Sequence, residues 1–280
     1  MLHRLFDTSL PGRVSRTLGY AADLPLPRRV LDPIIAAYSM AFGVDAHDVD
    51  VPDGGFACFG DFFARRLKPG ARPVAAGPDA FVAPCDGVLH AVLESNGAGT
   101  ALRVKGDDYS IDELLGARGE GERLAGGGGL VVYLHPRDYH RVHAPCRGEL
   151  VRVRHIPGAR FPVAPWSEKR VRGLYQRNER VVFFFDLPKG RALALTMVAA
   201  MGVGDIASPH APPPAPRDPT TRAMAPRLPL VAGDEVGAFR LGSTVVLLWS
   251  EGAVSLHPDL AIGQRVVQGQ AMGKLDTLES

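Results

Sequence analysis

Three side chains in this sequence have the types that make a serine nucleophilic. Ser243 follows Gly242 and begins an apolar run, His143 lies in a histidine-rich segment, and Asp86 precedes a glycine. A serine hydroxyl is a weak nucleophile until a base removes its proton, and a histidine base works best when a carboxylate fixes its tautomer. Ser243, His143 and Asp86 could supply these three roles. Each also has an ordinary structural explanation, because Gly-Ser and Asp-Gly pairs are common in turns and hairpins.

The histidine-rich segment also allows a metal-site hypothesis. His140, His143 and Cys146 are spaced three residues apart, and Cys85 with Asp86 could complete a tetrahedral zinc site. A pair of histidines in a core would show the same spacing. Because the sequence does not show the geometry of such a site, we predict no metal and keep a zinc-binding module as the alternative.

Longer motifs surround these residues, and together they resemble those of the phosphatidylserine decarboxylase proenzymes of the bacterial type. The resemblance covers the chain from about residue 20 to the C-terminus, and the motifs stand in the family's order. They are Phe62–Pro73 (FFARRLKPGARP), Ala83–Gly87 (APCDG), Tyr133–Pro145 (YLHPRDYHRVHAP), Arg177–Arg180 (RNER) and Gly242–Thr244 (GST). One of these motifs alone would be weak evidence, but their joint occurrence strongly indicates the family.

The resemblance implies that the chain cuts itself. In the family, the serine at this position attacks the carbonyl of the residue before it, here Gly242, and the chain breaks between residues 242 and 243. The products are a large chain (1–242) and a small chain (243–280). Ser243 becomes a covalent pyruvoyl group, which is the cofactor. By motif position, His143 is the base for this cut, Asp86 is its orienting partner, and His140 is the proton donor in later turnover.

The implied reaction is the decarboxylation of phosphatidylserine to phosphatidylethanolamine and carbon dioxide, through a Schiff base between the pyruvoyl group and the substrate amine. A related decarboxylase acting on another serine-bearing lipid head group, or on a soluble amino acid, is the alternative. Phe161–Ala164 reads FPVA where many members read FSVN, and Asp205 stands where we expect serine. Both departures bear on head-group recognition. Cys85 and His135 are further departures from the family's motifs.

Composition excludes several other classes of function. The chain of 280 residues has a net charge of +2 and a mean hydropathy of +0.01, which fits a globular protein. A nucleic-acid-binding surface or a disordered acidic tail would give a stronger charge. The three cysteines form no CxxC pair, so we expect a reducing compartment. The longest apolar runs, Pro33–Val44 and Ala192–Val203, are shorter than the ~18 residues that a membrane-spanning helix needs.

Residues 1–75 are predicted to form a helical segment that binds a membrane surface. Within it, Asp32 fits an N-cap, Pro33 the first helical residue and Gly43 the end of an amphipathic helix. A helical hairpin packed on the core is the alternative. With phosphatidylserine as the partner, this segment would attach the enzyme peripherally to the cytoplasmic face of the cell membrane. A homodimer of the two-chain product is a further expectation.

Residues 76–280 are predicted to form the decarboxylase core. Short apolar runs separated by Gly, Pro and Asp turns indicate a mostly antiparallel β structure, in the form of a barrel or sandwich, and the fold class is therefore α+β. The Pro-rich stretch 205–228 lacks periodicity and is predicted to be a long loop. The expected strands are Phe81–Val82, Gly87–Val92, Leu130–Leu134, Glu149–His155, Val181–Phe185, Leu193–Val203 and Thr244–Trp249, with Leu260–Gln270 alternating like further strands.

Overall fold

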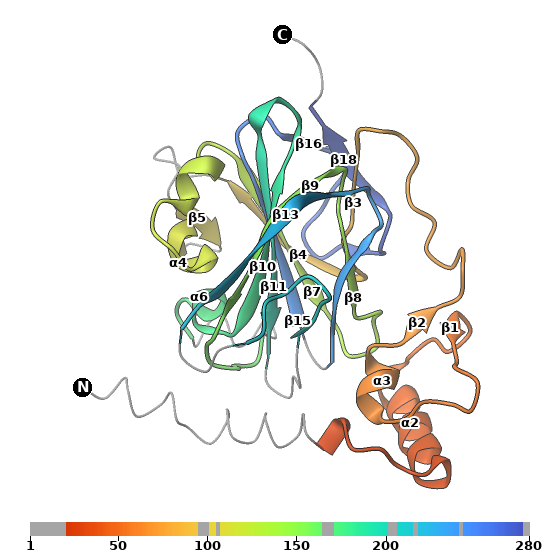
Figure 1. Cartoon of the computed structure of the whole chain (residues 1–280). Coiled ribbons are helices and arrows are strands. Elements are labelled where there is room, and N and C mark those ends of the chain that lie inside the picture. Colours follow the sequence, from red (N-terminus) through yellow and green to blue (C-terminus); the bar gives the residue numbers. More distant parts are fainter. Residues whose placement is uncertain are drawn as a thin grey trace.

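An eight-stranded antiparallel sheet forms the centre of the protein (Figure 1). The computed structural model describes residues 21–94, 101–104, 107–163, 171–200, 206–214, 218–240 and 243–276. The strand order of the sheet is β13-β9-β10-β11-β15-β7-β4-β17. In that order the strands are Thr220–Leu230, Gly148–Ile156, Arg180–Asp186, Ala192–Ala199, Ser243–Trp249, Gly128–Leu134, Gly87–Glu94 and Arg265–Val266.

The central strands are apolar along their whole length, because both of their faces are covered. All eight residues of β11 are buried, and so is every residue of β15 from Thr244 to Trp249. A continuous apolar run of this kind is typical of a strand buried on both faces. The strands that the sequence predicts around residues 81, 87, 130, 149, 181, 193 and 244 are confirmed.

Smaller sheets surround the large one, and every pair of strands in them is also antiparallel. The predicted mostly antiparallel core is therefore confirmed. The first three-stranded sheet contains β12 (Ile206–Ala207), β14 (Glu235–Phe239) and β8 (Arg141–His143), and the second contains β16 (Val254–Leu256), β18 (Ala271–Leu275) and β3 (Ala80–Val82). The two-stranded sheets are β1 (Val49–Asp50) with β2 (Arg66–Leu67), and β5 (Ala101–Val104) with β6 (Asp107–Ser110).

The helices of the described chain are short, apart from α2. They are α2 (Arg28–Phe42), α3 (Phe59–Phe63), α4 (Ile111–Leu115) and α6 (Leu174–Arg177), with 3-10 helices η2 (Glu120–Leu124) and η3 (Pro188–Gly190). Helices α2 and α3 lie together beside one end of the large sheet (Figure 1). Within the described residues, no helix combines the length and the hydropathy required to cross a bilayer.

Helix α2 begins earlier than the sequence predicts. It starts at Arg28 after Pro27, and Pro33 lies inside it. The prediction that Asp32 is the N-cap and Pro33 the first helical residue is therefore wrong. Pro33 removes one N–H donor from the helix, but its side chain is exposed, so water can reach the carbonyl left without a partner. The predicted end at Gly43 is confirmed, since Gly43 has φ 71° and donates its N–H to the Ser39 carbonyl at 2.9 Å.

The Pro-rich stretch 205–228 is not simply a long loop. Ile206–Ala207 form β12, and Thr220–Leu230 form β13 at the edge of the large sheet, paired with β9. The pairing is irregular between Ala223 and Leu228, where Pro226 lies. An edge strand tolerates proline because one side of its backbone has no ladder to complete. The loop prediction relied on the lack of periodicity, but an edge strand with mostly exposed residues lacks periodicity as well.

Strand β15 fixes the position of residue 243. Ser243 pairs with Ala199 of β11 on one side and with Leu134 of β7 on the other, and β15 is paired in this way along all of its residues. The C-terminal segment also supplies β17 to the large sheet and β16 and β18 to the sheet that contains β3. A chain break before Ser243 would therefore leave residues 243–276 held by backbone hydrogen bonds and by the core.

We expect a chain cut between Gly242 and Ser243 to yield two pieces that stay together. Under native conditions both pieces should elute as one species in size-exclusion chromatography, because β15 is buried between two partner strands. They should separate only in denaturant. Release of a free 243–280 peptide from folded, cut protein would contradict this prediction.

Candidate active site

Both motif histidines lie beside the strand that leads to Ser243. His143 is the last residue of β8, which pairs with β14, and Glu235 of β14 is its partner in register. The N–H of Phe239, the last residue of β14, donates to the His140 carbonyl at 2.9 Å. Phe239 precedes Ser243 by four residues, so the His140 backbone lies at the end of β14 nearer the expected cleavage point, and His143 lies farther along the same strand pair.

His143 has the tautomer that a general base requires. Its Nδ1 lies 2.7 Å from the Gly233 carbonyl, and its Nε2 lies 3.3 Å from the Tyr139 hydroxyl. A carbonyl only accepts, so Nδ1 carries the proton and Nε2 has a lone pair that can accept from Tyr139. Burial lowers the pKa of His143, although the hydrogen bond to Gly233 opposes this shift. The ring is therefore neutral near pH 7 and can take up a proton at Nε2.

His140 is neutral as well, and it is fully enclosed. Its exposed fraction is 0%, its Nδ1 donates to the Asp138 carbonyl at 2.8 Å, and its ring lies 4.0 Å from the Phe63 ring. Burial, together with the charge of nearby Arg65, lowers the pKa of His140 to about 3. The buried Nε2 has no hydrogen-bond partner in the part of the chain that the structure describes. Nε2 therefore has a lone pair that could accept a hydrogen bond from a ligand.

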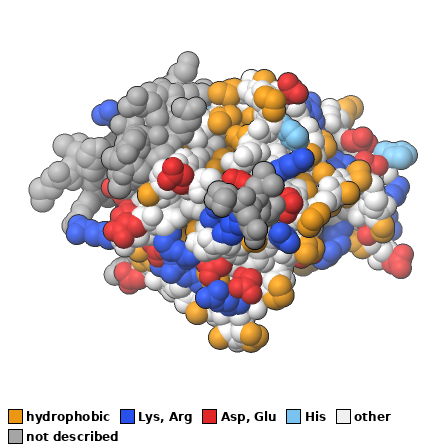
Figure 2. Space-filling model, turned by 90° about the horizontal axis from the view of Figure 1, so that it is seen from above, with side chains coloured by type: hydrophobic (Ala, Val, Ile, Leu, Met, Phe, Trp, Pro, Cys, Tyr) orange, Lys and Arg blue, Asp and Glu red, His pale blue; other side chains and the backbone are white. Residues whose placement is uncertain are grey.

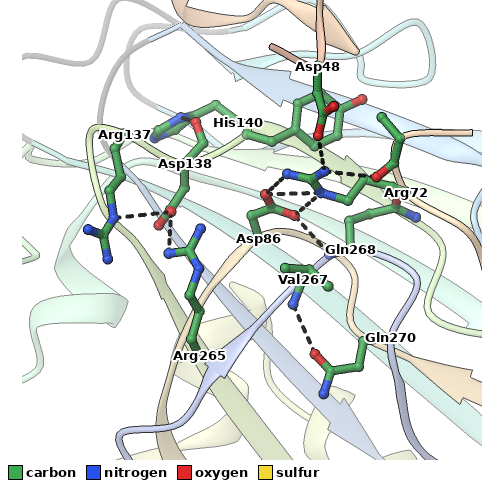
Figure 3. Close-up of polar contacts among 12 residues, drawn as sticks. Asp48, Arg72, Asp86, Arg137, Asp138, His140, Arg265, Val267, Gln268 and Gln270 are labelled. Carbon is green, nitrogen blue, oxygen red and sulfur yellow. Dashed lines mark hydrogen bonds and ion pairs between the residues drawn. The ribbon is translucent and has the colours of Figure 1, made fainter. Parts of the chain in front are cut away.

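Asp86 is held by a guanidinium that sequence reasoning left without a role. Arg72 donates from Nε to Asp86 Oδ1 at 3.0 Å and from Nη2 to Asp86 Oδ2 at 2.7 Å (Figure 3). The backbone N–H of Gln268 donates to Asp86 Oδ1 at 2.9 Å. The carboxyl group, which is 1% exposed, therefore has hydrogen-bond donors on both oxygens. The pairing also raises the pKa of Arg72.

Asp86 and His143 each have other partners in this structure, so they do not form the direct pair that the resemblance implies. Their separation is still short enough for the negative charge of Asp86 to favour a protonated His143. The roles of base and orienting group remain predictions. The side chain of Ser243 and residue 242 lie outside the described part of the chain.

A second buried carboxylate, Asp138, organises the loop that carries the histidines. Its Oδ2 accepts the His135 N–H at 2.7 Å and its Oδ1 accepts from Arg265 Nη1 at 2.8 Å (Figure 3). Its carbonyl accepts both His140 Nδ1 and Arg65 Nη2. Asp138 therefore has two roles: its side chain closes the loop through the His135 N–H, and its carbonyl fixes the orientation of the His140 ring. The sequence analysis did not single out Asp138, Arg265 or Arg65.

The other motif of the sequence, Arg177–Arg180, has a structural role. Asn178 is fully buried and hydrogen-bonds Phe161 through both its side-chain oxygen and nitrogen, and Ala199 through the nitrogen. Among the described residues, Arg180 donates to the backbone carbonyls of Glu113, Leu114, Gln176 and Asn178. Since Ala199 pairs with Ser243, Asn178 fixes the end of β11 next to the start of β15. Through Asn178, the motif thus supports the strand end next to Ser243.

The zinc alternative finds no support in the geometry. Among the described residues, no group of three or more His, Cys, Asp or Glu side chains is arranged to hold a metal ion. Burial raises the pKa of Cys85, and it raises the pKa of Cys146 to about 12. Both thiols are therefore protonated at neutral pH, whereas a zinc ligand must be a thiolate.

We expect His140 to make folding sensitive to acid. Below pH 6.5 the unfolded chain binds a proton at residue 140, whereas the folded chain does not bind it until about pH 3. Stability is therefore lost as pH falls through this range, at up to about 1.4 kcal/mol per pH unit. In the Ser243→Ala chain, adding His140→Gln should reduce the slope of unfolding free energy against pH by about this amount between pH 6 and 5. Denaturant titrations with equal slopes would contradict the buried neutral ring.

Comparison with known proteins gives this geometry its context. The family model for phosphatidylserine decarboxylase matches residues 59–274. The phosphatidylserine decarboxylase proenzyme of Anaeromyxobacter sp. (strain K) is 38% identical over 98% of this chain and 99% of its own length. That of Acidovorax ebreus (strain TPSY) is 40% identical over 85% of each chain, and that of Brevibacillus brevis is 33% identical over 97% of this chain and 95% of its own. The chain therefore belongs to the phosphatidylserine decarboxylase family of carboxy-lyases.

Proposed function

We propose that this chain is a self-processing enzyme that decarboxylates phosphatidylserine by means of a pyruvoyl group made from Ser243. The observation that carries the proposal is the pairing of β8 with β14, which sets His140 and His143 against the strand leading to Ser243. The names of the relatives, which are proenzymes of phosphatidylserine decarboxylase, support the substrate and the processing.

In the processing step, His143 would take the Ser243 hydroxyl proton at Nε2 as the oxygen attacks the Gly242 carbonyl. The hydrogen bond from Nδ1 to the Gly233 carbonyl keeps the lone pair on Nε2 until Nε2 takes up this proton. Gly242 has no side chain to obstruct the close approach of the attacking oxygen. Asp86, paired with Arg72, would stabilise the imidazolium that forms.

In the decarboxylation step, a pyruvoyl group at residue 243 would condense with the substrate amine and withdraw electrons as carbon dioxide leaves. The fold suits such a group, because β15 holds the new N-terminus between β7 and β11 after the chain is cut. His140 is fully buried, and its Nε2 has no partner among the described residues, so it would carry the proton that replaces carbon dioxide at the substrate Cα.

Helix α2 supports the proposal of a membrane-bound substrate. Its inner side packs through Leu31, which is fully buried, and through Tyr38, which contacts the rings of α3. A second side carries Val30, Ile34, Ala37 and Ala41, which recur at helical spacing and are all exposed. A surface helix normally exposes polar residues there. On the face seen from above in Figure 2, by contrast, acidic and basic side chains are interspersed with apolar ones.

The two histidines should separate processing from turnover. We expect His143→Ala and Asp86→Asn, like Ser243→Ala, to remain one uncut chain by intact-mass analysis. His140→Ala should be cut but should release carbon dioxide from phosphatidylserine roughly 100- to 10,000-fold more slowly, the usual contribution of a positioned proton donor. His257→Ala, at an exposed site, should behave as wild type. Efficient cutting of His143→Ala would remove the base assignment, and wild-type protein that consumes phosphatidylserine uncut would disprove the proposal.

The exposed apolar side of α2 should anchor the protein to lipid. Ile34 is 44% exposed, and inserting such a side chain contributes about 1.5–3 kcal/mol, so Ile34→Glu should weaken vesicle binding at least tenfold. The control Val231→Glu, in the turn between β13 and β14, should change it little, although Val231 is 60% exposed. Co-sedimentation with phosphatidylserine vesicles measures both. Equal loss in the two variants would point to net charge and not to α2.

A further inference from the structure

A buried positive charge beside the site is not used by the chemistry above. Arg65 is 3% exposed and lines a cavity of about 730 Å³. Its Nη2 donates to the carbonyls of Arg137 at 2.9 Å and Asp138 at 3.0 Å. Its Nε and Nη1 are also buried, yet they have no hydrogen-bond partner in the described chain. Folded proteins rarely leave N–H groups of a buried charge without an acceptor, so this guanidinium is prepared for a ligand.

Arg65 also differs from the other arginines of the same cavity, which already have carboxylate partners. For Arg65 the structure shows no carboxylate within ion-pair distance among the described residues, and burial lowers its pKa. The existing pairs are Arg141 with Glu235 at 2.5 Å, Arg66 with Glu235 at 3.7 Å, and Arg240 with Asp23 at 2.8 Å and Asp61 at 2.7 Å. Among the arginines that line this cavity, Arg65 is therefore the one whose charge has no carboxylate partner in the described chain.

We infer that Arg65 binds the phosphodiester of the lipid head group, an inference that rests on the proposed function. The cavity lies within reach of the reacting residue, because Arg240, which lines it, precedes Ser243 by three residues, or at most about 11 Å of extended chain. In a serine phospholipid, the phosphate is separated from the amine only by Cα, Cβ and one ester oxygen. A head group bound at residue 243 through its amine can thus place its phosphate in this cavity.

The phosphodiester fits this role better than the carboxylate of the same head group. The carboxylate loses its charge as carbon dioxide leaves, so a guanidinium on it would stabilise the ground state more than the transition state. The phosphodiester keeps its charge throughout the reaction. Direct contact between Arg65 and the phosphodiester would therefore hold the head group in substrate and transition state alike, which lowers KM.

Calorimetric titration of the full-length Ser243→Ala chain tests the inference without requiring turnover. The probes are sn-glycero-3-phosphoethanolamine, which has the diester but no carboxylate, L-serine, which has the carboxylate but no phosphate, and inorganic phosphate. We expect the diester to bind, Arg65→Gln to weaken it at least tenfold, and Arg65→Lys to weaken it less. The control Arg227→Gln, at a surface ion pair, should stay within twofold. L-serine should show no dependence on Arg65.

The outcomes distinguish this inference from the proposed function. Diester binding that is unchanged in folded Arg65→Gln overturns the inference, even if the wild type decarboxylates phosphatidylserine. Binding that depends on Arg65 sustains it, even if no carbon dioxide is released. Tighter binding of inorganic phosphate than of the diester would make this a free-phosphate site and overturn the head-group assignment. If Arg65→Gln does not fold, the Nε resonance of Arg65 in the Ser243→Ala chain decides, since saturating diester must shift it.

Discussion

The two-sided pairing of β15 is the constraint on which the rest of the site depends. A reactive group made by breaking the chain stands at a new chain end, and chain ends are normally poorly ordered. Here Ser243 is paired with both Ala199 and Leu134 at the start of a fully buried strand. Burial of β15 in the core offsets the conformational entropy that is lost when this chain end is ordered. The sheet can thus lose a peptide bond at this point and keep the geometry of the residues around it.

Around this fixed strand, buried charges hold the reacting loop in place. Asp86 is paired with Arg72, and Asp138 with Arg265, so each buried carboxylate has a guanidinium partner (Figure 3). Removing Arg72 would leave the buried Asp86 carboxylate without its guanidinium, and loss of one partner of a buried pair typically costs about 3–5 kcal/mol. The carbonyl of Asp138 in turn orients His140. The same few residues therefore pair the buried carboxylates and fix the orientation of the His140 ring.

The sequence was sufficient for the parts of this structure that depend on local pattern. The apolar runs of β11 and β15 predict buried strands, which the structure contains. The roles that the motifs give to Ser243 and the two histidines stay predictions. The partners of Asp86 and Asp138 could not be predicted, because nothing in their spacing shows which of many arginines will fold against them. Strand β13 was missed for a related reason, since its prolines are acceptable only at the edge of a sheet, and edges are decided by tertiary pairing.

The tautomer of His140 limits how it can act as a proton donor. Nδ1 already donates to the Asp138 carbonyl, so only Nε2 can deliver a proton, and the low pKa of the ring keeps Nε2 unprotonated at neutral pH. The largest cause of that low pKa is burial, and the next is the positive charge of Arg65. An anion bound to Arg65 would cancel that second cause, and the charge of His140 would then be less unfavourable. Binding of the head group at Arg65 would therefore make protonation of His140 easier when a substrate is present to receive the proton.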